Sequence, residues 1–383
     1  MRQTEALKDF SRRQEQLGER KVNSEASTAA SLSSSSSPSS SRVELGISSH
    51  GKSIHLHDLS GFNLAAPLGG AKMQRMGIGT HKLTGKNCVD AVSMAIKQGY
   101  RLIDTARCYK NEEAIAEALR NSDVPRNELF ITSKIDTKEM KSAAATTEAV
   151  MKALNNLKVQ YLDLMLLHWP GVKGLAQDST EHRIKRFEAY KALVKARNEG
   201  YIRHIGTYYH YKALPIPIHH INCQFSILFF HIYIYIGVSN FLKRHIEELT
   251  DDCQLEGIDD HVPYLNQLEL HPLCQQRETV AYCKQKGILV QAYSSLGTGQ
   301  LLSNETLVSV AKHYDITVSQ LLLLWALYKN VYVIPKSSRE ERLRSNYNVL
   351  YLCGSLGINI GDIATLDAME EDHHFCWNPV NIR

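Results

Sequence analysis

Four polar residues have the types and positions needed to protonate and orient a carbonyl group during its reduction. Asp104 and Tyr109 lie close together, while Lys134 ends the apolar run LFITSK and His168 ends the run LDLMLLH. Reduction by hydride needs an acid for the carbonyl oxygen, and free tyrosine, with a pKa of about 10, donates its proton reluctantly near neutral pH. We expect the Lys134 ammonium to lower the pKa of Tyr109. We expect Asp104 to keep Lys134 charged, and His168 to hydrogen-bond the substrate oxygen.

The chain beyond Leu68 alternates short apolar runs with amphipathic stretches of helical period. We expect eight strands, at residues 75–80, 101–106, 129–134, 162–168, 236–240, 265–270, 289–296 and 332–337. Several intervening helices are predicted to end at Gly99, Gly200 and Gly287, because glycine is common just after the last helical residue. Eight such units predict an α/β fold, the (β/α)8 TIM barrel, with its active site at the carboxyl ends of the strands.

A doubly wound parallel sheet is the structural alternative. Such sheets bind dinucleotides through G-x-G-x-x-G after the first strand, and the segment that starts at Gly297 (GTGQLL) lacks the third glycine. In the barrel, the ends of the second, third and fourth strands carry Asp104, Lys134 and His168. Each of these residues alone would be interpreted as a turn, packing or core residue. Together, at the carboxyl ends of neighbouring strands, they indicate a catalytic site.

The motifs around these residues resemble those of the aldo-keto reductase superfamily. They are DTARCYKNEEAIAEAL (104–119), ELFITSK, DLMLLHWP, GVSNF, NQLELHP, AYSSLG and IPKSSREERLRSN, in the family's order, from about residue 68 to the C-terminus. The resemblance implies that Tyr109 is the general acid and that Lys134 and Asp104 tune it. It also implies that His168 orients the substrate, with Trp169 and His81 as further substrate contacts.

The resemblance implies a nicotinamide cofactor as the hydride donor. Ser239, Asn240 and Gln267 would hydrogen-bond the nicotinamide carboxamide, and Tyr293 would stack on the ring. The last predicted strand ends at Lys336 and Ser337, and a helix is expected to begin near Ser338, so a helix start flanked by cations forms an anion site. In the resembled family the lysine and a later arginine grip the 2′-phosphate, so the resemblance implies NADPH rather than NADH. The full set of expected cofactor contacts is Thr80, Asp104, Ser239, Asn240, Gln267, Tyr293, Ser294, Leu296, Lys336, Ser337, Arg342 and Asn346.

Two residues depart from the family's pattern. Ser345 stands where many members have a glutamate that contacts adenine, and His81 stands where many have a tryptophan in the substrate pocket. The adenine contacts and the substrate preference are therefore left open. The loop at 294–305 is short, as in members whose cofactor exchanges freely.

Composition points to a protein of the cytoplasm. The chain has 44 basic and 40 acidic residues, well mixed, which implies no nucleic-acid or membrane partner. Its eight cysteines show no metal-ligand spacing, so we expect free thiols in a reducing compartment and no metal site. The pair His219 and His220 resembles a metal site only superficially. We expect a monomer that acts on small carbonyl substrates.

Residues 1 to 60 are predicted to be a disordered tail. Nine of the eleven residues from Ser31 to Ser41 are serine, and such a segment cannot bury enough apolar surface to fold. A phosphorylated regulatory segment is the alternative to a plain solvated extension. The acids Glu5, Asp9, Glu15 and Glu19 argue against a secretory or transit peptide. The remaining domain, residues 68–383, is the predicted barrel.

An insert at residues 207–237 interrupts the predicted fifth strand. The segments IRHIG, ending at Gly206, and VSNF, starting at Val238, form one strand in the resembled family. We interpret the 31 inserted residues as a translated, unspliced intron, because they preserve the reading frame and the IYIYI repeat implies an A/T-rich code. A membrane-docking element is one alternative, although Asn222, Gln224 and His231 oppose it. A long loop is the other, in which residues 232–240 replace IRHI as strand five.

The sequence thus predicts an NADP-dependent oxidoreductase that reduces aldehydes and ketones to alcohols, with Tyr109 as general acid. The competing hypothesis is a non-catalytic or inactive barrel, such as a cofactor-binding regulatory protein, because the fifth strand is interrupted. The four-residue set favours the enzyme. The identity of the aldehyde or ketone is not predicted.

Overall fold

The computed structural model describes residues 53–54, 73–208, 231–234, 236–258 and 262–383. The chain divides into two units, Met1–His50 and Gly51–Arg383. The first unit, nearly all of the predicted tail and the centre of the predicted insert lie outside the described residues. Within the second unit, β1 (Ser53–Ile54) pairs antiparallel with β12 (Ile358–Asn359), so one short piece of the predicted tail is a strand.

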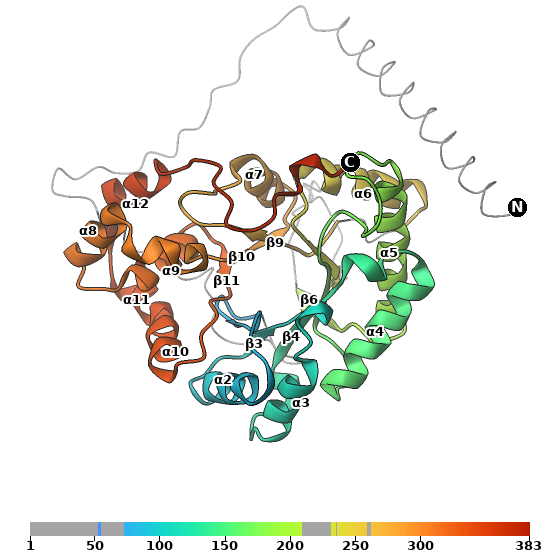
Figure 1. The fold of residues 1–383 in the computed structure, drawn as a ribbon, viewed down its shortest axis with the longest axis horizontal. Helices are drawn as coiled ribbons and strands as arrows, with labels where there is room; N and C mark the ends of the chain where they lie inside the picture. The colour runs from blue at the N-terminus through green and yellow to red at the C-terminus, as the bar shows by residue number, and fades with distance from the viewer. Residues whose placement is uncertain (1–52, 55–72, 209–230, 235, 259–261) are drawn as a thin grey trace, which may run out of the picture. The chain divides into compact units, whose positions relative to one another are not determined.

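The second unit is built on a sheet of eight parallel strands that the predicted runs identified correctly (Figure 1). In sheet order, which follows the chain, these are β2 (Ile78–Gly79), β3 (Leu102–Asp104), β4 (Phe130–Ile135), β5 (Leu164–Leu167), β8 (Ile236–Ser239), β9 (Leu265–Glu269), β10 (Leu289–Tyr293) and β11 (Tyr332–Val333). Sequential neighbours pair in parallel, which requires a crossover between each pair of strands.

The first and last strands pair with each other and close the sheet. Met76 and Val333 form a parallel bridge, and the Gly77 amide donates to the Val333 carbonyl at 2.9 Å. Gly79 allows a close approach at this seam, because a Cβ there would lie 2.6 Å from the Ile334 carbonyl oxygen. The fold is therefore a (β/α)8 barrel, and the doubly wound alternative is wrong.

Helices surround the strands (Figure 1). They are α2 (Gly85–Lys97), α3 (Glu112–Arg120), α4 (Ala143–Leu157), α5 (Glu181–Asn198), α6 (Lys243–Leu255), α7 (Arg277–Gln285), α8 (Glu305–His313), α9 (Val318–Tyr328), α10 (Glu340–Tyr347), α11 (Val349–Ser355) and α12 (Ile360–Asp367). In α2, residues spaced three and four apart are buried, among them Cys88, Ala91 and Ala95, so one face packs on the sheet. Gly99, which follows α2, has a φ of 103°, as predicted for a helix stop.

The core lies on both faces of the strands, as expected where helices cover a parallel sheet. All six residues of β4 and all four residues of β5 are buried. Phe130, Leu164, Leu166 and Leu265 belong to one buried apolar cluster. Lys134, at the penultimate position of β4, is a fully buried charged residue.

The fifth position of the barrel is filled from both sides of the predicted insert. Ile202 bridges Leu162, and the chain then leaves the barrel as β6 (His204–Tyr208). β6 pairs antiparallel with β7 (His231–Ile234) in a separate two-stranded sheet. The chain re-enters the barrel at β8, where Ile236 pairs with Met165 and Val238 with Leu167.

The register identifies which residues are extra. Continuing from the bridge between Ile202 and Leu162, Ile205 and Gly206 would face Met165 and Leu166, yet Ile236 and Gly237 occupy those positions. The two Ile-Gly pairs are interchangeable, so the 31 extra residues can equally be numbered 205–235. A glycine is needed here, because a Cβ on Gly237 would lie 2.7 Å from the Leu265 carbonyl oxygen. The long-loop prediction placed residues 232–240 in strand five. In the structure only the segment from Ile236 onward lies in the barrel, because residues 231–234 belong to the separate sheet.

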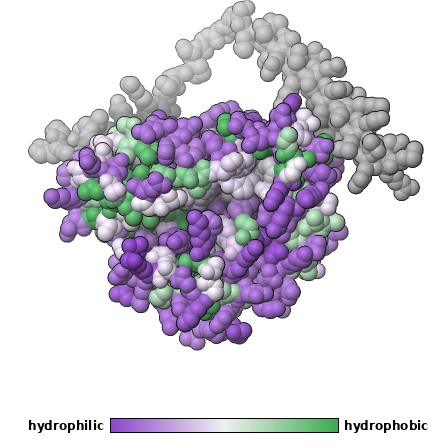
Figure 2. Space-filling model, in the orientation of Figure 1, coloured by the Kyte–Doolittle hydropathy of each residue, from purple (hydrophilic) through white to green (hydrophobic). Residues whose placement is uncertain are grey.

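The face shown in Figure 2 is mainly hydrophilic, with smaller apolar areas between the polar side chains. In the described part of the chain, no helix combines the length and the apolar character that membrane crossing requires.

Removal of the 31 extra residues should leave the barrel intact. Deleting 205–235 or 207–237 produces the same polypeptide, in which an Ile-Gly pair runs directly into Val238. We expect this shortened chain to fold with a thermal midpoint at least as high as that of the full chain, measured by circular dichroism. As a control, Gly237→Val in the full chain should lower the unfolding free energy by about 1–3 kcal/mol or more through overpacking. A shortened chain that fails to fold would show that the insert completes the barrel.

Candidate active site

The four predicted catalytic residues meet at the carboxyl ends of three neighbouring strands. Asp104 is the last residue of β3, Lys134 is the next to last of β4, and His168 directly follows β5. Tyr109 ends the short helix η2 (Arg107–Tyr109), which follows β3. The parallel register of β3, β4 and β5 places these strand ends side by side.

Lys134 is the centre of the arrangement. Its side chain is fully buried, and Nζ contacts Asp104 Oδ1 at 2.5 Å, the Thr105 carbonyl at 2.8 Å and the Tyr109 hydroxyl at 3.4 Å. A buried ammonium is stable only with such partners, because desolvation of a charge costs several kcal/mol. Tyr109 is thereby held beside a cation that is itself neutralised by Asp104.

The pKa of Tyr109 shifts in the direction opposite to the one expected from the sequence. Burial and the nearby Asp104 carboxylate raise the pKa of Tyr109 well above its ordinary value. The predicted lowering by Lys134 is wrong for the protein alone, because Asp104 pairs with the ammonium and desolvation disfavours the phenolate. Tyr109 therefore holds its proton throughout the neutral range.

His168 is uncharged in this setting. Burial, Lys134 and His81 lower its pKa well below the ordinary value of histidine. His168 Nδ1 lies 3.5 Å from the Cys108 Sγ atom, and burial raises the pKa of Cys108 to about 11. A protonated thiol can donate to Nδ1, which leaves the imidazole proton on Nε2. Cys108 was not predicted, although it lies in the same motif as Tyr109.

Aromatic rings lie beside Tyr109 and His168. The His81 ring lies 4.9 Å from that of Tyr109, and the Trp169 ring stacks 6.2 Å from that of His168. Trp377, from the C-terminal segment, meets Trp169 edge-on at 4.6 Å. The expected substrate residues His81 and Trp169 thus lie beside the tetrad, and Trp377 joins them from a region that no motif identified.

The residues expected to hold the carboxamide form one hydrogen-bonded network at the ends of β8, β9 and β10. Ser239 Oγ donates to the Gln267 carbonyl at 2.9 Å, and Tyr293 donates to Asn240 Oδ1 at 2.7 Å. Asn240 Nδ2 donates to the His168 carbonyl at 3.0 Å and to Ser239 Oγ at 3.1 Å. The network joins strand five, which follows the insert, to His168.

Gln267 joins this network to the ion pair. Its Nε2 donates to Asp104 Oδ2 at 2.7 Å and to Gln291 Oε1 at 2.6 Å. Asp104 therefore uses one carboxylate oxygen for Lys134 and the other for Gln267. The position of the carboxylate is fixed from both sides of the barrel.

The remaining expected cofactor residues differ in accessibility. Thr80 is fully buried, and its Oγ donates to the Asp104 carbonyl at 2.9 Å, so its side chain is committed within the protein. Ser294, directly after β10, has a φ of 50° and lies 3.4 Å from Cys376 Sγ. Leu296 directly precedes the helix η5 (Gly297–Ser303), which makes up most of the short loop expected at 294–305.

The predicted anion site lies where β11 leads into α10. The helix begins at Glu340, two residues later than the predicted start near Ser338, and the Arg339 amide donates to Ser337 Oγ at 3.1 Å. Lys336 and Arg342 are exposed, and within the described residues neither forms an ion pair with a carboxylate. Two cations are thus available for an anion. Asn346, on the same helix, is buried.

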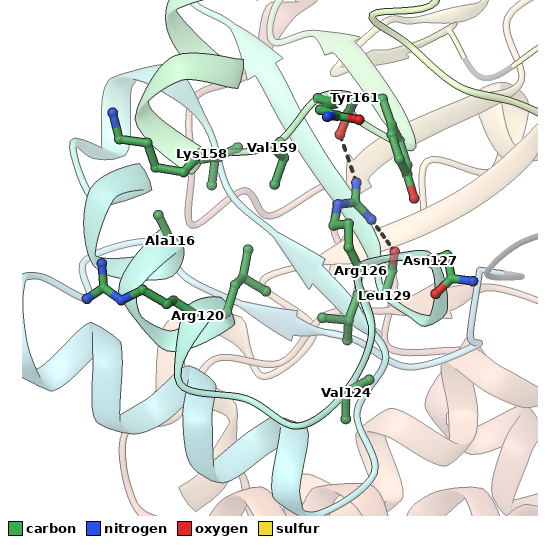
Figure 3. A pocket seen from close by; sticks show the side chains of 12 residues that line it. Ala116, Arg120, Val124, Arg126, Asn127, Leu129, Lys158, Val159 and Tyr161 are labelled. Carbon is green, nitrogen blue, oxygen red and sulfur yellow. Dashed lines mark hydrogen bonds between the residues drawn. The ribbon is translucent and has the colours of Figure 1, made fainter.

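A separate hollow of about 820 Å³ lies at the other end of the strands (Figure 3). Arg126 crosses it, donating to the Leu129 and Tyr161 carbonyls at 2.6 and 2.9 Å and pairing with the buried Asp163 at 2.6 Å. Leu129 and Tyr161 precede β4 and β5, so the hollow belongs to the amino ends of the strands, where residues serve stability. Its other lining residues are Ala116, Leu119, Arg120, Val124, Asn127, Leu157, Lys158, Val159 and Gln160.

Replacing Lys134 with methionine should destabilise the fold, because Asp104 would remain buried without its cation. We expect the free energy of unfolding in urea to fall by about 3–5 kcal/mol. The control is Lys152→Met on α4, whose exposed pair with Glu148 should change stability by no more than about 0.5 kcal/mol. Equal stability of the two variants would contradict a central role for the buried ion pair.

Known proteins share this sequence over most of its length. The model of the aldo/keto reductase family matches residues 74–211 and 234–369, so the break between the matched segments falls in the predicted insert. Glyoxal reductase of Bacillus subtilis (strain 168) is 35% identical over 311 residues, covering 81% of this chain and 94% of that protein. An aldehyde reductase of Saccharomyces cerevisiae is 32% identical over 287 residues, covering 74% and 85%.

The solved structures agree with the sequence comparison. An aldo-keto reductase enzyme from a Medee basin deep-sea metagenome library superposes with a TM-score of 0.65 at 28% identity, covering 82% of this chain and 97% of that one. An aldo/keto reductase from Brucella melitensis gives a TM-score of 0.62, also at 28% identity, with coverage of 78% and 95%. The chain belongs to the aldo/keto reductase family.

Proposed function

We propose that the chain reduces small aldehydes and ketones to alcohols with NADPH. The single observation that supports this most strongly is the contact of the buried Lys134 with both Asp104 and Tyr109 beside a neutral His168. Membership of an oxidoreductase family makes carbonyl reduction the expected chemistry. The relatives named for glyoxal and aldehyde reduction favour small aldehydes as the first substrates to test.

In the proposed reaction, hydride adds to the carbonyl carbon and a proton adds to the oxygen. When bound, the nicotinamide cofactor supplies the hydride. Tyr109 supplies the proton, which its raised pKa keeps in place until the oxygen becomes basic. His168, neutral and free to carry its proton on Nε2, donates a hydrogen bond to the same oxygen and orients the carbonyl.

The residues that would hold the cofactor fit it chemically. Ser239 Oγ lies 3.1 Å from Asn240 Nδ2 and 2.9 Å from the Gln267 backbone carbonyl, and a carboxamide with both donors and acceptors requires such hydroxyl and amide groups. The side-chain amide of Gln267 donates to Asp104 and Gln291 beside them. The half-buried Tyr293 presents an aromatic ring beside them. Lys336 and Arg342 offer two exposed cations to the 2′-phosphate that distinguishes NADPH from NADH.

The inactive-barrel hypothesis rested on the interrupted fifth strand. In the structure β8 pairs with both β5 and β9, and Asn240 directly after it hydrogen-bonds the His168 carbonyl. The geometric reason for inactivity is therefore absent from the described part of the barrel. We also propose that the protein is cytoplasmic, since the seven cysteines of the described residues are free thiols, as in a reducing compartment. The proposal of a monomer is kept from the sequence.

Tyr109→Phe should abolish reduction while leaving the fold unchanged. We expect kcat for an aldehyde to fall about 10²- to 10⁴-fold, the usual contribution of a general acid. Circular dichroism and cofactor binding should match the wild type. Tyr351→Phe, on the exposed surface of α11, is the matched control and should keep full activity. Near-wild-type turnover by Tyr109→Phe would show that another group is the acid.

Lys336→Met should weaken the binding of NADPH more than that of NADH. Loss of one charge-assisted contact to the 2′-phosphate, about 1.5–3 kcal/mol, should raise the Kd for NADPH roughly tenfold or more. The Kd for NADH should change little, and Lys312→Met on the exposed face of α8 should change neither. Equal losses for both cofactors would contradict the phosphate assignment, and the measurement is fluorescence titration of each variant.

A further inference from the structure

A second cluster of reactive side chains lies apart from the catalytic tetrad. Cys274, in the loop after β9, meets Asp372 and His374 of the C-terminal segment. His374 Nε2 lies 3.5 Å from Cys274 Sγ and 3.3 Å from Asp372 Oδ1, and the three atoms lie within 4.8 Å of one another. Ligands of tetrahedral zinc lie roughly 3.4–3.8 Å apart, given metal–ligand bonds of about 2.0–2.3 Å. The observed spacing is close to that of a metal site.

Glu269 fixes the orientation of the histidine. His374 Nδ1 lies 3.2 Å from Glu269 Oε2, and a proton donated from Nδ1 leaves a lone pair on Nε2, which lies 3.3 Å from Asp372 Oδ1. Cys274 Sγ lies 3.5 Å from Nε2 and 3.7 Å from Nδ1, so the imidazole has to turn for Nε2 and Sγ to share one ion. Metal-binding histidines almost always make such a bond to a carboxylate with their second nitrogen. Glu269 is itself held, because it accepts the Phe375 and Cys376 amides at 2.9 and 3.2 Å.

Carboxylates lie beside the imidazole of His374. Glu269 Oε2 lies 3.2 Å from His374 Nδ1, and Asp372 Oδ1 lies 3.3 Å from His374 Nε2. A divalent cation bound here would join these carboxylates and would hold the sulfur of Cys274 as a thiolate.

We propose that Cys274, Asp372 and His374 bind one zinc ion through Sγ, Oδ1 and Nε2, with water as the fourth ligand. Sulfur, imidazole and carboxylate together are the ligands that zinc accepts, whereas magnesium and calcium take oxygen. Binding releases the Cys274 proton to solvent. The sequence predicted no metal, because about 100 residues separate the cysteine from its two partners and no spacing motif remains.

The ion would anchor the segment that completes the substrate side of the active site. Directly after His374, Cys376 lies 3.4 Å from Ser294, and Trp377 contacts Trp169 beside His168. The metal therefore acts as a clamp on one wall of the pocket. This consequence rests on the proposed reductase function, whereas metal binding itself does not.

The first test is titration of the metal-free full chain with cobalt(II), which reports thiolate ligation by a sulfur-to-cobalt absorption band. We expect one equivalent to bind with this band, and zinc to displace it. Cys274→Ser should abolish the band, and Cys353→Ser, a buried cysteine on α11, should keep it. A band that survives in Cys274→Ser, or no binding at all, would overturn the proposal. So would loss of binding only on replacing His219 and His220.

The second test separates metal binding from a structural role of the same residues. Glu269→Gln should keep the ligands but weaken zinc binding by about 10- to 100-fold, the usual effect of a second-layer carboxylate. Zinc should raise the thermal midpoint of the wild type and leave that of Cys274→Ser unchanged. An equal rise in both proteins would place the ion elsewhere and contradict the assignment. Both tests stand even if reductase activity is absent.

Discussion

The ion pair between Lys134 and Asp104 is the interaction on which the rest of the structure depends. A fully buried ammonium is stable only if it is surrounded by acceptors, and Asp104, Thr105 and Tyr109 provide them. These acceptors come from β3 and from the turn after it, so the charge fixes how two neighbouring strands end. Asp104 also accepts from Gln267 across the barrel, which extends the same constraint to the sixth strand.

The fifth strand shows that the barrel accepts the extra residues only at a position where the strand register is preserved. The chain leaves and re-enters the barrel at an Ile-Gly pair, and the same pair occurs before and after the extra residues. The glycine is needed at this position because a side chain would clash with the Leu265 carbonyl oxygen. The strand that re-enters then carries Ser239 and Asn240 to the rim. Because the Asn240 side chain donates to the His168 carbonyl, a shift of register would displace Ser239 and Asn240 relative to His168.

Much of the fold could be predicted from the sequence, because each buried strand is a short apolar run and helices such as α2 end at glycine. The set Asp104, Tyr109, Lys134 and His168 could be predicted because each residue lies at or just after a strand end, within a motif that resembles the family's. The direction of the pKa shift of Tyr109 could not be predicted, since it depends first on how deeply the hydroxyl is buried and then on how close the Asp104 carboxylate lies. Trp377 was also missed, because no pattern shows that the C-terminal segment returns to Trp169.

The most direct test of the account is transfer of deuterium from the nicotinamide C4 position to product. The full chain is incubated with an aldehyde and with NADPH deuterated on one face or the other, and the alcohol is analysed by mass spectrometry. We expect deuterium at the carbinol carbon from one face only, and little transfer by Lys134→Met. Absence of transfer by the full chain, or equal transfer by that variant, would contradict it.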